Sequence, residues 1–356
     1  MMHLLFLHGG KEWTGRARVF ATVAAGLAER GYTTAFALPE GSDAARLAAQ
    51  MGVTVVPLSG ERGTWRDSRR LREILAAQPA DAVFVHSDHE HLVAALAMRK
   101  LRNAVIVRRL GAGEHTDQSI RTRRAEKLMP VRYLYTSENP QTGQAAPSGM
   151  PSPMRVDLGV ALPEQVTPSP EDGYTLLACI ASREAIRRAT HVIRATAYLA
   201  QRHPVLRLRV IGSAAADPDL QVLASALGIG RRVEWIPHVA DPASALTGVT
   251  AGWVVADGDD AVLGVLNLMA SGIVALTEQS SIAAKYVSHG IHGVLLGNLE
   301  PPEMAAETTV LLANAERRRA MGASARLRVT REFSLRQMLA GFESVARASR
   351  DRRTPR

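Results

Sequence analysis

The chain has 356 residues, of which 46% are hydrophobic and 22% charged. This length exceeds what a single hydrophobic core usually supports, and the composition excludes a disordered chain, so two globular domains are expected. Aromatic residues make up only 4% and no basic module with interleaved aromatic residues stands out, which argues against nucleic-acid binding despite the net charge of +9.

No stretch approaches the roughly 20 apolar residues of a membrane span, and the opening MMHLLFLHGG lacks the basic region of a secretion signal. The single cysteine, Cys179, lies in the apolar run TLLACIA, so we expect a buried thiol and a cytoplasmic protein. Basic residues are in excess in residues 1–160, with 21 Lys and Arg against 15 Asp and Glu. Attraction of anionic substrates, attraction to an anionic membrane surface and simple solubility are three open explanations.

Short apolar runs alternate with helical patterns along the N-terminal half. A helix is expected after the first strand, because Val19, Val23 and Leu27 recur at a spacing of four and Gly31 can end it. Several runs lack polar alternation, which is typical of parallel strands buried on both faces. The predicted strands are residues 3–7, 33–38, 53–58, 81–86, 104–109 and 132–137.

A segment rich in proline, glycine and serine, residues 138–173, indicates a domain boundary. A second alternating block follows it, and residues 301–348 have a helical pattern throughout. Strands are predicted in this block at 174–181, 206–212, 232–237, 251–256, 273–277 and 293–297. The predicted domains are residues 1–155, residues 156–333, and a C-terminal helix with a basic tail at 334–356.

Two such α/β blocks predict two parallel-sheet lobes that face a cleft. Ligands of open parallel sheets bind at the carboxyl ends of the strands, where helix N-termini converge. Gly9 and Gly10 directly follow the first strand, so they could offer free N–H groups and a close backbone approach to an anion. A tight turn between strand and helix is the structural alternative.

Three histidines, His86, His89 and His91, follow the strand at 81–86. His86 is expected at the strand tip and is a candidate for the cleft, whereas a zinc site is not favoured by this spacing. Ser87 or Asp88 is expected to cap the next helix.

Arginines lie at or just after the carboxyl ends of two other predicted strands. Arg108 and Arg109 end the run AVIVRR and suit recognition of phosphate or carboxylate, with a surface ion pair to Glu114 or Asp117 as the alternative. In the second block, a cluster at a helix start could hold a diphosphate or could be a solvated charged face; it comprises Arg183, Arg187 and Arg188.

The order and spacing of several segments resemble family 4 glycosyltransferases, which have two Rossmann-like lobes of the GT-B type. The resemblance runs along nearly the whole chain. It is carried by the GG after the first strand, PADAVFVHS, VDLGV, HVIRATAYLAQRHPVLRLRVIG, RRVEWIPHV, DGDDAVLGVLNLMASGIVALT, HGVLLG and RLRVTREFSL. It implies retaining transfer from a nucleotide sugar of the UDP or GDP type, with no other cofactor and no protein-bound metal.

The resemblance also implies roles for individual residues. The two basic groups that hold the diphosphate fall on Ser182 or Arg183 and on Arg187 or Arg188, of which we choose Arg183 and Arg187. The segment against the nucleobase falls on Pro237, His238 and Val239. The two acidic positions of the donor motif fall on Asp259, next to the sugar, and on Asn267, next to the ribose. Between these two positions the family has a glycine-phenylalanine-glycine turn, which is replaced here by Asp260, Ala261 and Val262. Leu263 is the next position of the motif.

This donor motif is degenerate. Asp259 keeps a carboxylate with a shorter reach, and Asn267 loses the charge but keeps a donor and an acceptor. Asp260 adds a negative charge and Val262 a branched side chain where close approach is expected.

The sequence therefore predicts a glycosyltransferase that joins a nucleotide sugar to a glycan, a lipid-linked or a small-molecule acceptor. A catalytically silent relative that binds a nucleotide, glycan or partner protein is the alternative, and a sugar-phosphate epimerase or another two-lobed enzyme is a third. Two basic amphipathic helices, at 65–77 and 119–129, suggest weak contact with anionic lipid at the inner membrane face.

Overall fold

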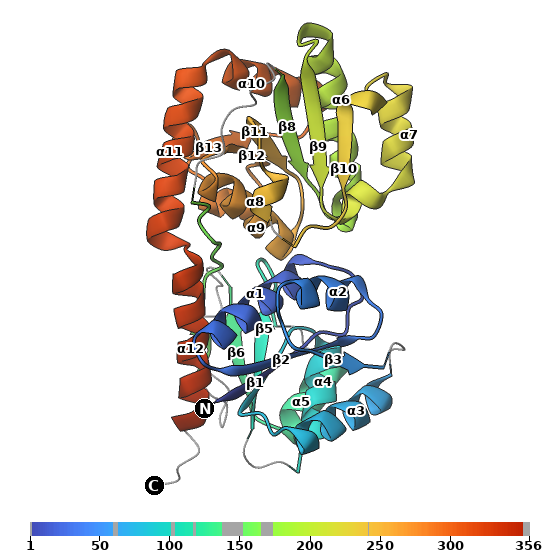
Figure 1. Ribbon diagram of the computed structural model, residues 1–356, viewed down its shortest axis with the longest axis vertical. Coiled ribbons are helices and arrows are strands. Elements are labelled where there is room, and N and C mark those ends of the chain that lie inside the picture. The colour runs from blue at the N-terminus through green and yellow to red at the C-terminus, as the bar shows by residue number, and fades with distance from the viewer. Residues whose placement is uncertain are drawn as a thin grey trace. The chain divides into compact units, whose positions relative to one another are not determined.

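The computed structural model describes residues 2–59, 63–100, 104–116, 119–136, 152–164, 174–240 and 242–351. The chain divides into two compact units (Figure 1). Unit 1 comprises Met1–Leu158 with Arg336–Arg356, and unit 2 comprises Gly159–Leu335. Each unit is an α/β structure on one parallel sheet, which confirms the predicted fold class of two Rossmann-like lobes.

Unit 1 has a seven-stranded parallel sheet among its described residues, in the order β3-β2-β1-β4-β5-β6-β7. The central strands are buried on both faces, as their apolar runs predicted. The strands are β1 (His3–Leu7), β2 (Thr33–Pro39), β3 (Val55–Leu58), β4 (Ala82–Val85), β5 (Val105–Leu110), β6 (Val131–Tyr135) and β7 (Met154–Arg155).

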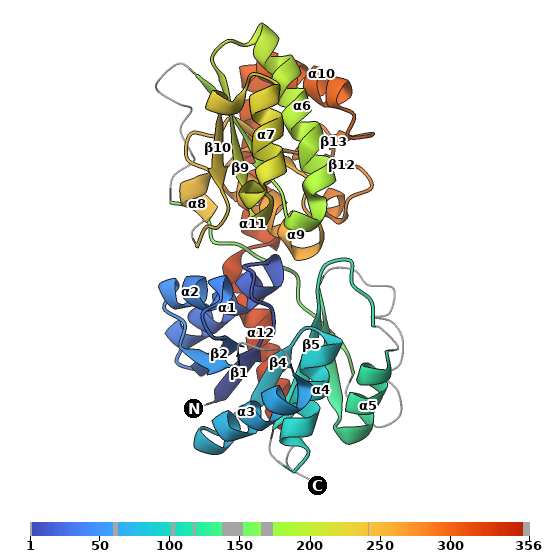
Figure 2. The same ribbon diagram turned by 90° about the vertical axis from the view of Figure 1, so that its right-hand side faces the viewer.

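Helices cover both faces of this sheet (Figures 1 and 2). Helix α1 ends as predicted, because Gly31 adopts a φ of +86°, a left-handed conformation that favours glycine. The helices are α1 (Gly15–Glu29), α2 (Asp43–Gln50), α3 (Thr64–Ala77), α4 (Asp88–Met98), α5 (Ile120–Leu128) and α12 (Leu335–Asp351).

Alternation along the strands separates two hydrophobic layers in unit 1. Leu5 and Leu7 of β1 belong to a buried cluster with residues of α3, α4 and α5. Phe6 lies on the opposite face, where its ring centroid is 5.2 Å from that of Phe20 in α1. Helix α12 packs on the same layer, because Phe342 lies 5.8 Å from the Phe84 ring of β4. A helix from the C-terminal part of the sequence thus belongs to the N-terminal core.

Unit 2 has six parallel strands within its described residues, in the order β10-β9-β8-β11-β12-β13. All six correspond to runs predicted from the sequence. They are β8 (Thr175–Ile180), β9 (Leu206–Ile211), β10 (Val233–Ile236), β11 (Ala251–Val254), β12 (Val274–Glu278) and β13 (Gly293–Leu296). The helices are α6 (Ile186–Arg202), α7 (Pro218–Ala226), α8 (Pro242–Ala245), α9 (Gly258–Ala270), α10 (Pro301–Ala313) and α11 (Ala315–Glu332).

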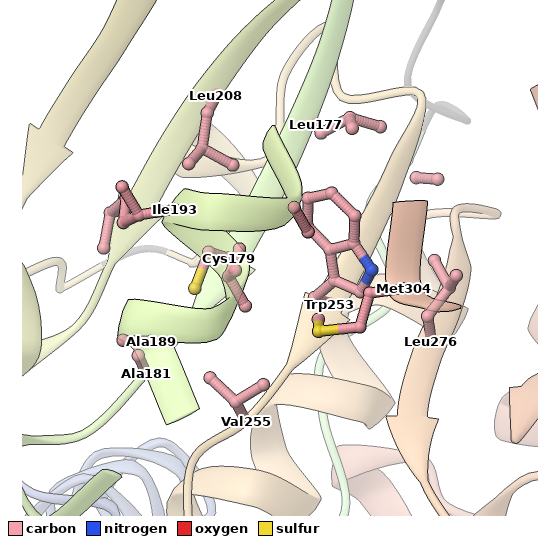
Figure 3. Close-up of a cluster of buried hydrophobic side chains, with 14 of the residues drawn as sticks. Leu177, Cys179, Ala181, Ala189, Ile193, Leu208, Trp253, Val255, Leu276 and Met304 are labelled. Atoms are coloured by element: carbon pink, nitrogen blue, oxygen red, sulfur yellow. The ribbon is translucent and has the colours of Figure 1, made fainter. Parts of the chain in front are cut away.

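The main core of unit 2 surrounds Trp253 of β11, beside Met304 of α10 (Figure 3). Cys179 lies in the same cluster, and burial raises the pKa of its thiol to about 12. This confirms the predicted buried cysteine. On the other face of the sheet, Gly252 lets α9 approach closely, because a Cβ at this position would lie 2.8 Å from a methyl carbon of Leu268.

No helix in the described ranges combines the length and apolar character that a membrane span requires.

Candidate functional site

Each sheet has one point at which the direction of the connections reverses. In unit 1 the chain leaves β1 toward β2 and β3 on one side and returns to β4 and β5 on the other. In unit 2 the same reversal separates β8 from β11. Ligands of open α/β sheets bind outside the carboxyl ends of the strands at such switch points. The predicted site residues that follow β1, β4, β8 and β11 are therefore those best placed for binding.

A buried carboxylate lies at the switch point of unit 1. Glu90 Oε1 accepts the N–H of Gly9 at 2.8 Å, and Oε2 accepts the N–H groups of His86 at 2.9 Å and Ser87 at 3.0 Å. Ser87 also caps α4, because its hydroxyl accepts the N–H of Glu90. One side chain thus joins the turn after β1 to the turn after β4.

His8 lies against this carboxylate, with Nδ1 3.5 Å from Glu90 Oε1. The ring is only 6% exposed, and neither nitrogen has a hydrogen-bond partner within the part of the chain that the structure describes. Burial alone would raise the pKa of Glu90, but the close approach of His8 and the Gly9 N–H lower it, so this pKa lies well below its usual range. Glu90 is therefore charged at neutral pH.

The expectation of a free N–H group at Gly9 is wrong, because Glu90 already accepts it. Gly10 has a different structural role. A Cβ at Gly10 would lie 2.5 Å from His8 Nε2, so only glycine lets the chain pass over the imidazole. Contact of these two glycines with a donor stays a prediction.

His86 is 2% exposed, and its ring stacks on Phe20 with centroids 3.8 Å apart. Its Nε2 is 3.1 Å from the carbonyl oxygen of Arg16, and its Nδ1 is 3.5 Å from Nη1 of Arg109. Because a guanidinium can only donate and a carbonyl oxygen can only accept, this arrangement suits a ring with a proton on Nε2. The predicted catalytic role of His86 stays a prediction.

The other two histidines of the VHSDHEH segment point to different surroundings. His89 Nε2 lies 3.3 Å from Asp67 Oδ2, whereas His91 is fully buried in α4. Among the described residues, no three His, Cys, Asp or Glu side chains are grouped as metal ligands.

Arg108 and Arg109 of β5 are 3% and 1% exposed, so the alternative of surface ion pairs is wrong for both. Arg108 donates from Nε to the carbonyl oxygen of His86 and from Nη1 to the Thr122 hydroxyl. Glu114 pairs with Arg16, and Asp117 lies outside the described residues. As neighbours in a strand, the two arginines project to opposite faces of the sheet, and each contacts a different part of His86.

At the switch point of unit 2, the turn after β8 is built from small residues. The backbone N–H of Arg183 donates to the Ser213 hydroxyl at 2.9 Å. Gly212 adopts a φ of +109° and passes so close to Ala181 that a Cβ would lie 2.4 Å from its carbonyl oxygen. Ser182 is 4% exposed, and its hydroxyl has no hydrogen-bond partner in the described ranges. Buried polar groups normally have hydrogen-bond partners, so this hydroxyl distinguishes the turn from ordinary core packing.

The three arginines at this turn differ in their surroundings. The side chains of Arg183 and Arg187 are exposed, as a group that meets a dissolved anion must be. Arg188 instead donates from Nε to the carbonyl oxygen of Val255 at 2.9 Å and pairs with Asp257. The expected cationic cluster is thus partly neutralised by a carboxylate from the turn after β11.

The degenerate acidic motif begins α9. Asp259 lies in the first turn and is 5% exposed, and Ala261 and Val262 are fully buried. Leu263 is also buried, so these three residues pack inside unit 2, and their contact with a donor stays a prediction. Asn267 Nδ2 donates to the Leu263 carbonyl oxygen at 2.8 Å, so this amide donor is used within its own helix.

Pro237, His238 and Val239 are half-buried in the segment after β10, at the same edge of the sheet. A pocket of about 700 Å³ lies elsewhere on unit 2, and no predicted site residue lines it. It is formed by α6, the turn after α7 and the start of α10, with Arg194 and Tyr198 among its residues.

The sequence interpretation missed Glu90 and His8. Only Glu90 had a local signal, because it stands three residues after the capping Ser87. His8 owes its position to the end of β1 and had no distinguishing pattern.

Both units match known families. Residues 13–136 match the family described as Glycosyltransferase Family 4, and residues 165–328 match the family described as Glycosyl transferases group 1. A search of curated proteins finds no match.

Solved structures share the fold across the whole chain. A glycosyltransferase from Rickettsia africae is 14% identical with a TM-score of 0.73, and the match covers 98% of each chain. Anabaena HepE in complex with UDP-glucose is 15% identical with a TM-score of 0.75, covering 98% of this chain and 100% of HepE. Sucrose-phosphate synthase from Thermosynechococcus elongatus is 12% identical with a TM-score of 0.72, covering 98% and 99%. These likenesses establish the GT-B type of fold. The two glycosyltransferase family matches fall in different parts of this fold, that of residues 13–136 within unit 1 and that of residues 165–328 within unit 2.

Proposed function

We propose that this chain transfers a sugar from a nucleotide-sugar donor to an acceptor, with retention of configuration and without a protein-bound metal. One observation carries the proposal. The switch point of unit 2 presents exposed Arg183 and Arg187 beside the buried, unpartnered hydroxyl of Ser182, within a region that matches a glycosyltransferase family. The complex of the Anabaena relative with UDP-glucose supports a UDP-type donor.

The chemistry needs stabilisation of a leaving diphosphate. The bond between the sugar's anomeric carbon and the phosphate oxygen breaks, and the diphosphate departs with the electron pair. The acceptor oxygen bonds to that carbon, and its proton passes to the departing diphosphate. Guanidinium groups at the start of α6 stabilise the negative charge on the diphosphate as it grows, which is the role we propose for Arg183 and Arg187.

We further propose that Asp259 faces the sugar, that Asn267 contributes its side-chain oxygen to the ribose hydroxyls, and that the Pro237–Val239 segment lies against the base. On the acceptor side, His86, Arg108 and Arg109 are buried, so we propose that they shape the edge of unit 1 on which the acceptor lies. The acceptor is a glycan, a lipid-linked sugar or a small molecule in this proposal.

Calorimetry with UDP, GDP and UDP-glucose tests the proposal, together with assays of transfer and hydrolysis over a panel of acceptors. We expect micromolar nucleotide binding and turnover of the donor. If a nucleotide binds but no donor is consumed, the protein is a silent relative, and Asn267→Glu then tests whether the missing carboxylate is the reason. If no nucleotide binds, the proposal fails.

Asp257→Asn is expected to tighten UDP binding by up to about fivefold. The substitution removes a negative charge beside the proposed diphosphate site and releases Arg188, and exposed ion pairs of this kind are worth about 0.2–1 kcal/mol. Calorimetry measures the change. Glu332→Gln, which breaks a pair with Arg328 on α11, is the control and should leave affinity unchanged. A loss of affinity in Asp257→Asn would show instead that Asp257 supports binding.

A specific observation favours the peripheral membrane contact predicted from the sequence. Trp65 and Ile120 are 67% and 85% exposed in the first turns of α3 and α5. Both helices begin at the carboxyl edge of the sheet, because each directly follows a parallel strand. Their cations are Arg66, Arg69, Arg70 and Arg72 on α3 and Arg121, Arg123, Arg124 and Lys127 on α5. We propose that this edge contacts anionic lipid on the inner membrane face.

Co-sedimentation with phosphatidylglycerol vesicles is expected to exceed that with phosphatidylcholine vesicles. The double substitution Trp65→Ser and Ile120→Ser should weaken the binding about tenfold or more, because each apolar side chain is worth about 1.5–3 kcal/mol when buried. The matched control is Val222→Ser with Val310→Ser, two exposed apolar positions on unit 2. Equal sedimentation with both lipids would exclude the contact.

A further inference from the structure

The corner between β1 and β4 has the construction of an anion-binding site. Three backbone N–H groups, from Gly9, His86 and Ser87, converge on one carboxylate at 2.8–3.0 Å. The corner lies at the N-terminus of α4, an 11-residue helix whose dipole adds positive potential. A helix start that contains a capping box needs its glutamate only for the N-cap N–H. Here the same carboxylate also reaches a turn 81 residues away in the sequence.

The surroundings of the corner are cationic or unsatisfied. The imidazole of His8 is only 6% exposed, and its nitrogens have no hydrogen-bond partner in the described chain. The His8 Nδ1 lies 3.5 Å from Glu90 Oε1. Gly10 lies against the opposite edge of the ring, beside Nε2. Arg108 and Arg109 lie behind His86. The N–H groups, the start of α4 and the nearby guanidinium groups all favour a negative charge in this corner.

We propose that Glu90 is a built-in anion that fills this corner and thereby excludes phosphate from it, so that the acceptor group meeting the turn after β1 carries no negative charge. The inference rests on the proposed function, because only sugar transfer requires an acceptor. The occupation of the corner by Glu90 is a property of unit 1 alone. Glu90 is in this sense a specificity-determining residue. It uses the Gly9 N–H that an incoming phosphate oxygen would otherwise accept.

Glu90→Ala tests the inference, because it empties the corner and leaves the three N–H groups in place. Sodium formate and inorganic phosphate are the probes, and sodium chloride of equal ionic strength controls for salt. We expect the variant to be less stable than the natural protein in chloride, and to be stabilised selectively by formate and phosphate. At ten times the dissociation constant of the probe, its folding constant should rise about tenfold.

Glu114→Ala is the matched control, since Glu114 also accepts a turn N–H, that of Gly111 at 2.8 Å, but its side chain is 27% exposed. It should gain nothing from formate beyond the chloride effect. If Glu90→Ala does not fold in chloride, its refolding yield is compared between formate and chloride. A higher yield in formate is then the expected result. Glu90→Gln keeps the corner filled and should show no rescue.

Two results would overturn the inference. One is equal stabilisation of Glu90→Ala by formate and chloride. The other is phosphate-dependent shifts of the Gly9 and Ser87 amide resonances in the natural protein. Because none of these measurements needs sugar transfer, failure of the proposed enzymatic activity would leave this test intact.

Discussion

Arg187→Ala is expected to weaken UDP binding by about tenfold to a hundredfold. Arg187 is exposed in the first turn of α6, at the switch point between β8 and β11, where a bound diphosphate would meet the N-terminus of the helix. A hydrogen bond to a charged group is worth about 1.5–3 kcal/mol, and each 1.4 kcal/mol is a factor of ten in affinity. Calorimetric titration of the variant and the natural protein measures the difference.

Arg194→Ala provides a matched control on the same helix. Arg194 is also exposed but lies seven residues further from the helix start and lines the separate pocket beside α10. Arg194→Ala changes the net charge of the protein by the same amount as Arg187→Ala. Any general electrostatic effect on UDP binding therefore appears in both variants. Equal affinity losses in the two would remove the assignment of the diphosphate to the start of α6.

Phe342→Ala is expected to lower the free energy of unfolding of unit 1 by about 3–5 kcal/mol. Phe342 is 1% exposed, and its ring contacts Phe84 in the aromatic layer formed with α1. Removing a buried phenyl group loses its transfer free energy and leaves a cavity. Hydrogen exchange of peptides from β1 and β4 should accelerate, while exchange in the strands of unit 2 should not change.

Val310→Ala is the control for this substitution, because Val310 is 57% exposed on α10 and its truncation leaves no cavity. Acceleration of exchange in both units of Phe342→Ala would show that α12 stabilises the whole chain. Unchanged exchange in β1 would show that the aromatic layer holds without the helix.

The strands were predictable because each is a local signal. Runs such as TLLACI and VIVRRL are apolar over the length of a strand, and burial on both faces requires this composition. The confirmed burial of Cys179 follows from the same run. The buried state of Arg108 and Arg109 was less accessible to prediction, because the end of a strand can be exposed or covered by a neighbouring loop or helix.

The details of the site were not predictable, because partners far apart in the sequence decide them. Arg188 has the same local setting as Arg187, and only the turn after β11 determines that Arg188 pairs with Asp257. Gly9 directly follows a strand, where its N–H could meet an anion, but Glu90 accepts that N–H. Neither partner can be deduced from residues near the arginine or the glycine. The roles of Asp259 and Asn267 in binding a donor remain predictions.

The packing of α12 on unit 1 has a consequence for biosynthesis. Unit 2 is continuous from Gly159 to Leu335, whereas unit 1 needs the segment from Arg336 onward. Chains emerge from the ribosome with the N-terminus first. The aromatic layer of β1 and β4 therefore stays incomplete until all of unit 2 has been translated, although its strands are made first. The later-synthesised unit thus has its whole sequence available for folding before the earlier one does.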